Sequence, residues 1–310
     1  LAIKGKKNDG HKFISQAFKK GASYVLSSSN KDNKKNIDKI IKIQNPIIFL
    51  NKFAKLKRNN CNAKIVSITG SAGKTSLKNM LYELLKKYDS TYASPRSFNN
   101  HYGVPVSLSN LNSDHRYGIF EVGMSKAGEI NRLSKLIKPD LAIITNIAEA
   151  HIENFKNTAG IAKAKAEIIY NIKKNGTIIL NRDDSFFDYL KKIAISKKLK
   201  VLTFGKHVNS DICLSKIKTR KFTKILHIRI LDEIFEIKVN NINIYNVLAS
   251  LAVLKELNMN LQRVINSFEY IKPSQGRGRI HLIKRYKKVF NLIDESYNAN
   301  PLSVKSAINN

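Results

Sequence analysis

The segment from Thr69 to Ser76, TGSAGKTS, contains residue types that can hold phosphate. Its small residues let backbone N–H groups approach an anion, while a lysine can reach terminal phosphates and a threonine hydroxyl can bind Mg²⁺. Ile68 stands where the common GxxxxGKT spacing has its first glycine, so the loop is a shortened form. The candidate phosphate-binding residues are Gly70, Ser71, Ala72, Gly73, Lys74, Thr75 and Ser76.

A strand and a helix are predicted on either side of this loop. The preceding KIVSI (64–68) has the β-branched, apolar character of a buried strand. The loop would then lie at the amino end of a helix, where the dipole favours an anion, so phosphate binding is favoured over an ordinary glycine-rich turn. One apolar stripe at helical spacing defines the helix: Leu77, Met80, Leu81, Leu84, Leu85 and Tyr88.

Two further polar residues follow predicted strands. Glu121 ends the strand in FEVGMS (120–125), and His151 comes soon after the strand in TNIAEAHIENF (145–155). In an open parallel sheet these strand ends line the ligand crevice. Each residue alone is more typical of a solvated strand end. Together with Thr75 they predict an Mg²⁺ site, in which histidine is the unusual ligand.

Strands and helices alternate along the chain, which is typical of an α/β fold with a mostly parallel sheet. The amino-terminal 9–22 is predicted to be a helix with Phe13, Ala17 and Phe18 on one face. Three segments between 211 and 239 are typical of an antiparallel flap that precedes a helix over 243–258. Further strands are predicted at 23–28, 46–50, 117–122, 140–147, 176–181 and 200–205.

The composition excludes several classes of protein. The formal charge is +32, but the lysines are spread over nearly every segment beside abundant Asn and Ile, so we do not expect a nucleic-acid-binding protein. Cys61 and Cys213 lie far apart and predict neither a disulfide framework nor a zinc site. No apolar run reaches the length of a membrane span, and we expect a cytoplasmic protein.

The chain resembles the Mur ligase family over nearly its whole length. The shortened loop, FEVGMS and TNIAEAHIENF are similar to motifs of that family. LIDESYNANP is the most discriminating stretch, because it is similar to the branch that adds D-Ala-D-Ala. The other similar stretches are SFNNHYGVP (97–105), AKAKAEIIY (162–170) and LNRDD (180–184).

The resemblance implies an ATP-dependent amide ligase of peptidoglycan synthesis. ATP would phosphorylate the terminal carboxylate of UDP-N-acetylmuramoyl-tripeptide, and the amine of D-Ala-D-Ala would attack the acyl phosphate. It implies ATP and two Mg²⁺ ions as cofactors, and Lys74, His151 and Lys165 as catalytic residues. Lys165 matches a family lysine that is carbamylated and binds metal, so the implied metal ligands are Thr75, Glu121, His151 and Lys165. Lys163 is the competing candidate two residues away.

Further site residues are implied by the same resemblance. Asn243 matches a residue that contacts adenine, although Ile242 replaces the family histidine before it. Arg277 and Asp294 are expected near the nucleotide, where Glu295 departs from the common second aspartate. Asn99 and Asn100 are expected near the substrate, although asparagine is also common in turns.

The resemblance also implies three regions. Residues 1–60 would be part of a UDP-binding α/β domain, 61–290 the central P-loop domain and 291–310 the start of a Rossmann-like domain. We therefore expect a fragment that is poorly active by itself, and a monomer. A folylpolyglutamate-type or cyanophycin-type ligase is the alternative, which would share the loop but not the Asn-Asn and SYNANP stretches.

Overall fold

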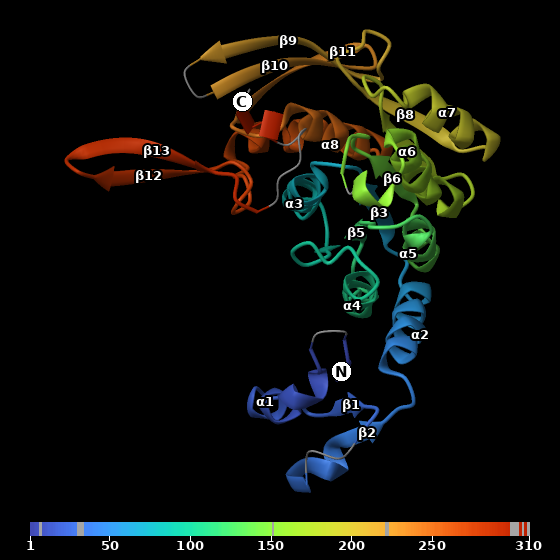
Figure 1. Cartoon of the computed structure of the whole chain (residues 1–310). Helices are drawn as coiled ribbons and strands as arrows, with labels where there is room; N and C mark the ends of the chain where they lie inside the picture. Colours follow the sequence, from blue (N-terminus) through green and yellow to red (C-terminus); the bar gives the residue numbers. More distant parts are fainter. Residues whose placement is uncertain are drawn as a thin grey trace.

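A nine-stranded sheet forms the centre of the computed structural model (Figure 1), which describes residues 1–5, 8–29, 34–150, 152–220, 223–297, 304–305 and 307–308. The strand order is β11-β10-β9-β8-β7-β6-β3-β5-β4. All neighbouring pairs from β4 across the sheet to β9 are parallel, and β10 pairs antiparallel with both β9 and β11. The predicted α/β class and the predicted flap are therefore confirmed. The bounds are β3 Lys64–Thr69, β4 Thr91–Ala93, β5 Tyr117–Glu121, β6 Leu141–Ile144, β7 Thr177–Asn181, β8 Lys200–Gly205, β9 Ile212–Arg220, β10 Thr223–Ile230 and β11 Glu233–Asn240.

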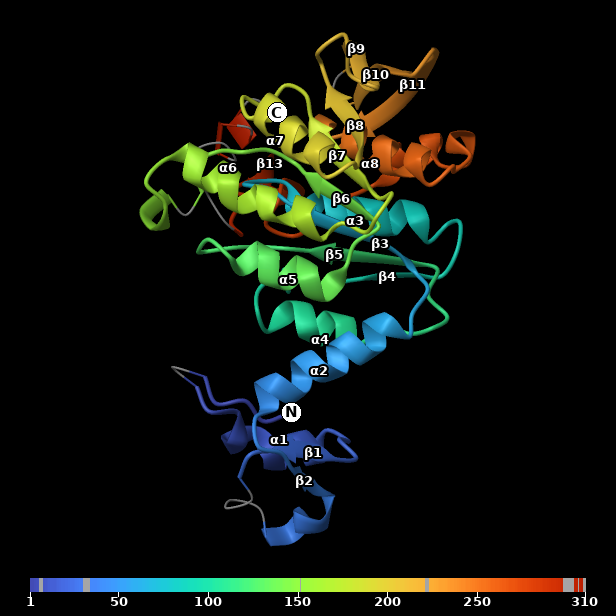
Figure 2. The ribbon, with the colours of Figure 1, turned by 90° about the vertical axis from the view of Figure 1, so that its right-hand side faces the viewer.

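Helices cover both faces of this sheet, as Figure 2 shows. Alternate residues of β3 point to opposite sides, so that Val66 and Ile68 join one apolar core while Ile65 joins the other. The first core lies under α3 and α8, and the second under α4, α5, α6 and α7. The helices are α3 Lys74–Leu85, α4 Gly103–Ser109, α5 Glu129–Ile137, α6 Thr158–Ala166, α7 Phe187–Ser196 and α8 Ile244–Glu256, with 3₁₀ turns at Ile152–Asn154, Glu167–Asn171, Leu261–Arg263 and Ile265–Tyr270.

The strand β3 is the point where the chain changes direction across the sheet. Its neighbours β5 and β6 lie on opposite sides of it, so the connections after β3 and β5 run in opposite directions. Ligands bind at such a switch point, at the carboxyl ends of the strands. The glycine-rich loop directly follows β3 and therefore occupies this position.

The predicted strand at 46–50 is wrong, because these residues begin the helix α2, Pro46–Asn59. Asn45 caps this helix by accepting hydrogen bonds from the amides of Ile47 and Ile48, and Pro46 suits the first helical turn. A short apolar run cannot be assigned to strand or helix by periodicity alone. Burial at Leu50, Ala54 and Arg58, four residues apart, reveals the helix.

The amino-terminal unit is small and is joined to the rest by α2 (Figure 1). The predicted first helix is confirmed as a 3₁₀ turn, Gly10–Phe13, capped by Asp9, followed by α1, Ile14–Lys19. Phe13 is 55 % exposed, so Ile14 rather than Phe13 joins Ala17 and Phe18 at the small core. The remaining elements are β1 Val25–Ser27, a 3₁₀ turn Lys34–Lys39 and β2 Ile40–Lys42.

The helix α2 is anchored to the central unit through a buried arginine. The guanidinium of Arg58 donates hydrogen bonds to the carbonyls of Cys61, Ile137 and Lys138. Its burial lowers the pKa, which the carboxylate of Asp140 partly offsets. The helix α2 is therefore packed against the central unit.

A hairpin follows the central unit and projects from it in Figure 1. It consists of β12, Arg279–Arg285, and β13, Lys288–Asp294, and the sequence analysis did not anticipate it. Among the residues that the structure describes, no helix has both the length and the apolarity that crossing a membrane requires.

Candidate active site

The backbone of the phosphate loop requires glycine at two positions. Gly70 has φ +145°, and a Cβ there would lie 1.9 Å from the Thr145 hydroxyl oxygen. Gly73 has φ +84° and caps α3 without a side chain, so no side chain bonds to the first amides of that helix. Those amides and the positive end of the helix dipole favour an anion at this point.

Asn146 holds the loop from the end of the neighbouring strand β6. Its carbonyl accepts the amide of Ser71 at 2.9 Å, and its side-chain oxygen accepts the amide of Ala72 at 2.9 Å. Thr145 adds a hydrogen bond from its hydroxyl to the Ala72 carbonyl. Two of the amides that we expected to face phosphate are therefore bonded within the chain, which leaves those at the start of α3. Asn146 was not among the predicted site residues, although it lies near the end of the predicted strand 140–147.

Lys74 lies at the first position of α3 and its ammonium donates to the Gly70 carbonyl at 2.7 Å. Burial lowers its pKa, the carboxylate of Glu121 opposes that shift, and the guanidinium of Arg277 adds to it. A bound phosphate would stabilise the charged ammonium, since burial alone makes the charge unfavourable.

Thr75 and Glu121 are brought together as predicted. The Thr75 hydroxyl donates to the Glu121 carboxylate at 2.7 Å, and the Asn99 amide donates to the other carboxylate oxygen at 2.7 Å. Glu121 is 1 % exposed. A hydroxyl and a buried carboxylate are hard oxygen donors, which fit Mg²⁺ with phosphate and water completing its shell. His151 lies outside the described residues, and those residues contain no group of three His, Cys, Asp or Glu side chains that could hold a metal.

Lys165 is buried at the end of α6 and lines the same cavity as Thr75 and Glu121. Its side chain is 3 % exposed, and within the described chain no carboxylate is paired with it. Burial places its pKa well below the ordinary lysine value, and the neighbouring Lys74 lowers it further. Lys163 is exposed, so the structure separates the two lysines that the sequence left in competition.

Most of the predicted catalytic and metal-binding residues line this cavity, which has a volume of about 990 Å³. Asn99 and Asn100 also line it, but both make hydrogen bonds within the chain. The Asn99 carbonyl accepts the amide of Gly123, and the Asn100 side chain accepts the amides of Tyr102 and Gly103 at the start of α4. Asn100 therefore holds the turn that leads into α4 and is also a substrate candidate.

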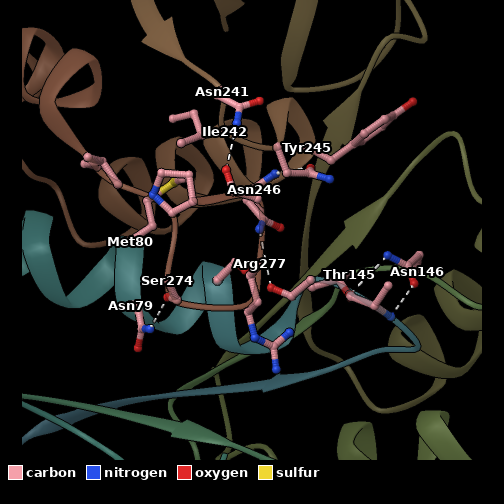
Figure 3. Close-up of a pocket in the computed structure, with 18 of the residues that line it drawn as sticks. Asn79, Met80, Thr145, Asn146, Asn241, Ile242, Tyr245, Asn246, Ser274 and Arg277 are labelled. Atoms are coloured by element: carbon pink, nitrogen blue, oxygen red, sulfur yellow. Dashed lines mark hydrogen bonds between the residues drawn. The ribbon is translucent and has the colours of Figure 1, made fainter. Parts of the chain in front are cut away.

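A second cavity of about 1070 Å³ lies on the other side of the loop and is shown in Figure 3. Asn243 lines it and caps α8 by accepting the amide of Asn246 at 3.1 Å. Asn246 is buried, and its amide group contacts Gly73 of the phosphate loop, a role that the sequence analysis missed. Ile242 forms part of the wall at the position of the family histidine. Arg277 lines both cavities.

Asp294 lines neither cavity, and its carboxylate is used within the chain. It accepts the amides of Gly276 and Ser296 and the Ser296 hydroxyl. The hydrogen bonds from Ser296 are the main reason that its pKa is lowered. Glu295, the residue that departs from the family pattern, lines the larger cavity. The nucleotide-binding role of Asp294 therefore stays a prediction.

Replacing Gly70 by alanine is expected to weaken nucleotide binding at least about tenfold and to destabilise the fold by about 1–3 kcal/mol. The new Cβ would displace Thr145, which holds the loop. Calorimetric titration with ADP and urea unfolding measure the two effects. Gly128→Ala is the matched control, because Gly128 has φ +86° but open space around its Cβ. Equal losses in both variants would show that backbone strain, not contact with Thr145, is responsible.

Replacing Lys165 by methionine is expected to stabilise the chain in buffer without Mg²⁺ or CO₂ by about 1–3 kcal/mol at pH 7. Because the pKa of Lys165 is lower in the folded than in the unfolded chain, the unfolded chain holds more protons between the folded pKa and about pH 10.4, and wild-type stability rises with pH over that range. The advantage of the variant should therefore shrink toward pH 9.5. Urea unfolding at both pH values measures this, and a variant less stable than wild type at pH 7 would contradict it.

These features define the class of protein as a P-loop nucleotide-binding α/β protein, with the loop at the sheet's switch point beside a hydroxyl–carboxylate pair. A family model described as the Mur ligase middle domain matches residues 68–254. The chain therefore belongs to the Mur ligase family.

Similar proteins extend the match to nearly the whole chain. The UDP-N-acetylmuramoyl-tripeptide–D-alanyl-D-alanine ligase of Rickettsia prowazekii is 35 % identical over 99 % of this chain and 68 % of its own length. The enzyme of that name from Buchnera aphidicola is 33 % identical over 99 % of this chain and 66 % of its own length. The crystal structure of MurF ligase from Thermotoga maritima in complex with ADP is 30 % identical, with a TM-score of 0.83, covering 99 % of this chain and 70 % of that one. The chain spans about two thirds of the length of these relatives.

Proposed function

We propose that this chain is the nucleotide-binding part of an ATP-dependent ligase that joins D-Ala-D-Ala to UDP-N-acetylmuramoyl-tripeptide in peptidoglycan synthesis. The observation that carries the proposal is the cavity in which the phosphate loop, the Thr75–Glu121 pair and the buried Lys165 meet. The choice among ligases is supported by the names of the similar proteins.

The phosphate loop would bind the triphosphate of ATP and position its γ-phosphoryl group. A carboxylate is a poor acyl donor, and its phosphorylation makes amide formation by an incoming amine favourable. Charge develops on the transferred phosphoryl oxygens, so fixed cations are needed there. Lys74, at the start of α3, and Arg277, which lines both cavities, would supply these cations.

We further propose that Thr75 and Glu121 would hold Mg²⁺, which neutralises phosphate charge when bound. His151 stays a predicted ligand. Carbamylation of Lys165 is supported by its burial without a carboxylate partner among the described residues, because the neutral amine is the form that attacks CO₂. The amine nitrogen would bond to the carbon of CO₂ and release one proton, so that the lysine becomes a carboxylate-like oxygen ligand for a second Mg²⁺.

The remaining assignments follow the same proposal. The larger cavity, with Asn243 in its wall, would hold the nucleoside of ATP, and Asn99 and Asn100 would lie near the peptide substrate. Residues 1–60 would belong to a UDP-binding domain, 61–290 to the central domain and 291–310 to the start of a third domain. We propose that the protein works as a monomer in the cytoplasm.

The test measures phosphate release by the complete protein with ATP, Mg²⁺ and UDP-N-acetylmuramoyl-tripeptide, with different amines added. D-Ala-D-Ala is expected to support release, whereas glutamate is not. Release supported by glutamate, or without any amine, would instead favour the folylpolyglutamate-type or cyanophycin-type alternative.

A further inference from the structure

A directional series of hydrogen bonds ends at the Thr75–Glu121 pair. The Tyr297 hydroxyl donates to the Ser97 hydroxyl oxygen at 2.8 Å, which in turn lies 3.2 Å from the Thr75 hydroxyl oxygen. Because the Thr75 proton is directed to Glu121, the Ser97 proton is the one available for the Thr75 oxygen. Tyr297 and Thr75 are more than 200 residues apart, so the series connects distant parts of the chain.

The Ser97 end of this series is held rigidly. Lys78 is 1 % exposed, and its ammonium donates to the carbonyl of Ser94 at 2.5 Å and to the carbonyl of Arg96. Lys78 lies one turn after Thr75 on α3. The segment that carries Ser97 is therefore fastened to the same helix that carries Thr75.

The Tyr297 end is fastened to the turn that carries Arg277. The Tyr297 amide donates to the Gly276 carbonyl at 3.1 Å, and the Arg277 guanidinium carbon lies 4.2 Å from the centre of the Tyr297 ring. Gly276 has φ +70°, and a Cβ there would lie 2.8 Å from the Tyr297 Cβ. Asp294 fixes the same turn through the Gly276 amide. Tyr297 and Arg277 are thus positioned as one unit.

We infer that the Tyr297–Ser97 hydrogen bond, termed here the Tyr297–Ser97 bridge, holds Arg277 at the border of the two cavities. Tyr297 and Ser97 are then positioning residues for phosphoryl transfer, and Arg277 is the group they position. The inference rests on the proposed function, since it assumes that a phosphoryl group is transferred between these cavities. Arg277 would meet the charge that develops there, so the bridge contributes more in the transition state than in ground-state binding.

The test compares calorimetric affinities for Mg²⁺·ADP alone and with tetrafluoroaluminate, which mimics the phosphoryl group in transfer. Tyr297→Phe keeps the ring beside Arg277 and removes only the hydroxyl. It is expected to weaken the fluoroaluminate complex about tenfold and ADP binding less than about twofold. In a Ser97→Ala background the same change is expected to have no further effect on either affinity, because the Tyr297–Ser97 bridge is already absent there.

Tyr286→Phe is the matched control, because Tyr286 is 80 % exposed and also has an arginine, Arg285, over its ring. It should change neither affinity. A Tyr297→Phe variant with wild-type affinity for the fluoroaluminate complex would overturn the inference. The inference would also be overturned if Tyr297→Phe weakened the fluoroaluminate complex as much in the Ser97→Ala background as in the wild-type chain. If Ser97→Ala does not fold, an Arg277→Met background replaces it, in which Tyr297→Phe should again have no effect.

Failure of the bridge and failure of the proposed function are distinguishable in this design. The affinity measurements need no peptide or amine substrate. If Tyr297→Phe weakens the fluoroaluminate complex as expected while the complete protein does not use D-Ala-D-Ala, this inference stands and the substrate assignment fails.

Discussion

Replacement of Lys74 by alanine is expected to lower kcat/KM of ligation by at least about 10³-fold, the scale on which a cation at a transferring phosphoryl group acts. Lys74 is the first residue of α3 and its ammonium already lies over the loop, bonded to the Gly70 carbonyl. The variant should fold, because removing a buried ammonium removes a desolvation penalty. Coupled assay of ADP production by the complete protein measures the loss.

Lys86→Ala is the control for this prediction. Lys86 directly follows the same helix, but its side chain is 43 % exposed, and its ammonium pairs with Glu83 and lies over the ring of Tyr82. Removing it should change the rate less than about twofold, since exposed ion pairs contribute little. A Lys74→Ala variant that retains more than about a tenth of the wild-type activity would exclude the lysine from phosphoryl transfer.

Replacement of Lys165 by alanine is expected to reduce ligation by about 10²–10³-fold and to be partly reversed by short-chain carboxylates such as acetate or propionate. The truncated side chain leaves space in the cavity, and an added carboxylate supplies the oxygen that the proposed carbamate would provide. The expected result is therefore a rate that rises with carboxylate concentration in the variant and not in wild type. Steady-state rates at fixed ionic strength measure it.

Lys163→Ala is the matched control, because Lys163 lies two residues away on α6 and is exposed. It should retain wild-type activity. Loss of activity in both variants would indicate damage to the helix, and full activity in Lys165→Ala would remove this lysine from the site.

The sequence predicted the parts of the site that a local pattern specifies. The loop, the strand before it and the apolar stripe of α3 depend on neighbouring residues, and all three are present, although α3 ends at Leu85 and the predicted Tyr88 lies beyond it. The meeting of Thr75 with Glu121 was predicted because Glu121 ends one strand and the loop before Thr75 follows another, and the carboxyl ends of these strands share one edge of the sheet.

Contacts between distant segments were not predictable in the same way. Asn146 and Ser97 contact the loop or Thr75 from the segments that follow β6 and β4, and Asn246 contacts the loop from α8. An asparagine or serine at such positions is equally common in turns and caps. The helix α2 was missed because its apolar residues begin with a run of four, which suits a strand as well. The burial of Lys165 needed the packed fold, since the sequence alone gives no reason to bury one lysine among so many.

Transfer of labelled oxygen tests the central claim, that ATP activates the peptide carboxylate by phosphorylating it. The measurement supplies the complete protein with UDP-N-acetylmuramoyl-tripeptide that carries ¹⁸O in both oxygens of its terminal carboxylate, together with ATP, Mg²⁺ and D-Ala-D-Ala. Because the amine displaces phosphate from the acyl carbon, one labelled oxygen should appear in each released phosphate and one should remain in the new amide. Released phosphate without label would contradict the account, since the carboxylate oxygen would never have been bonded to phosphorus.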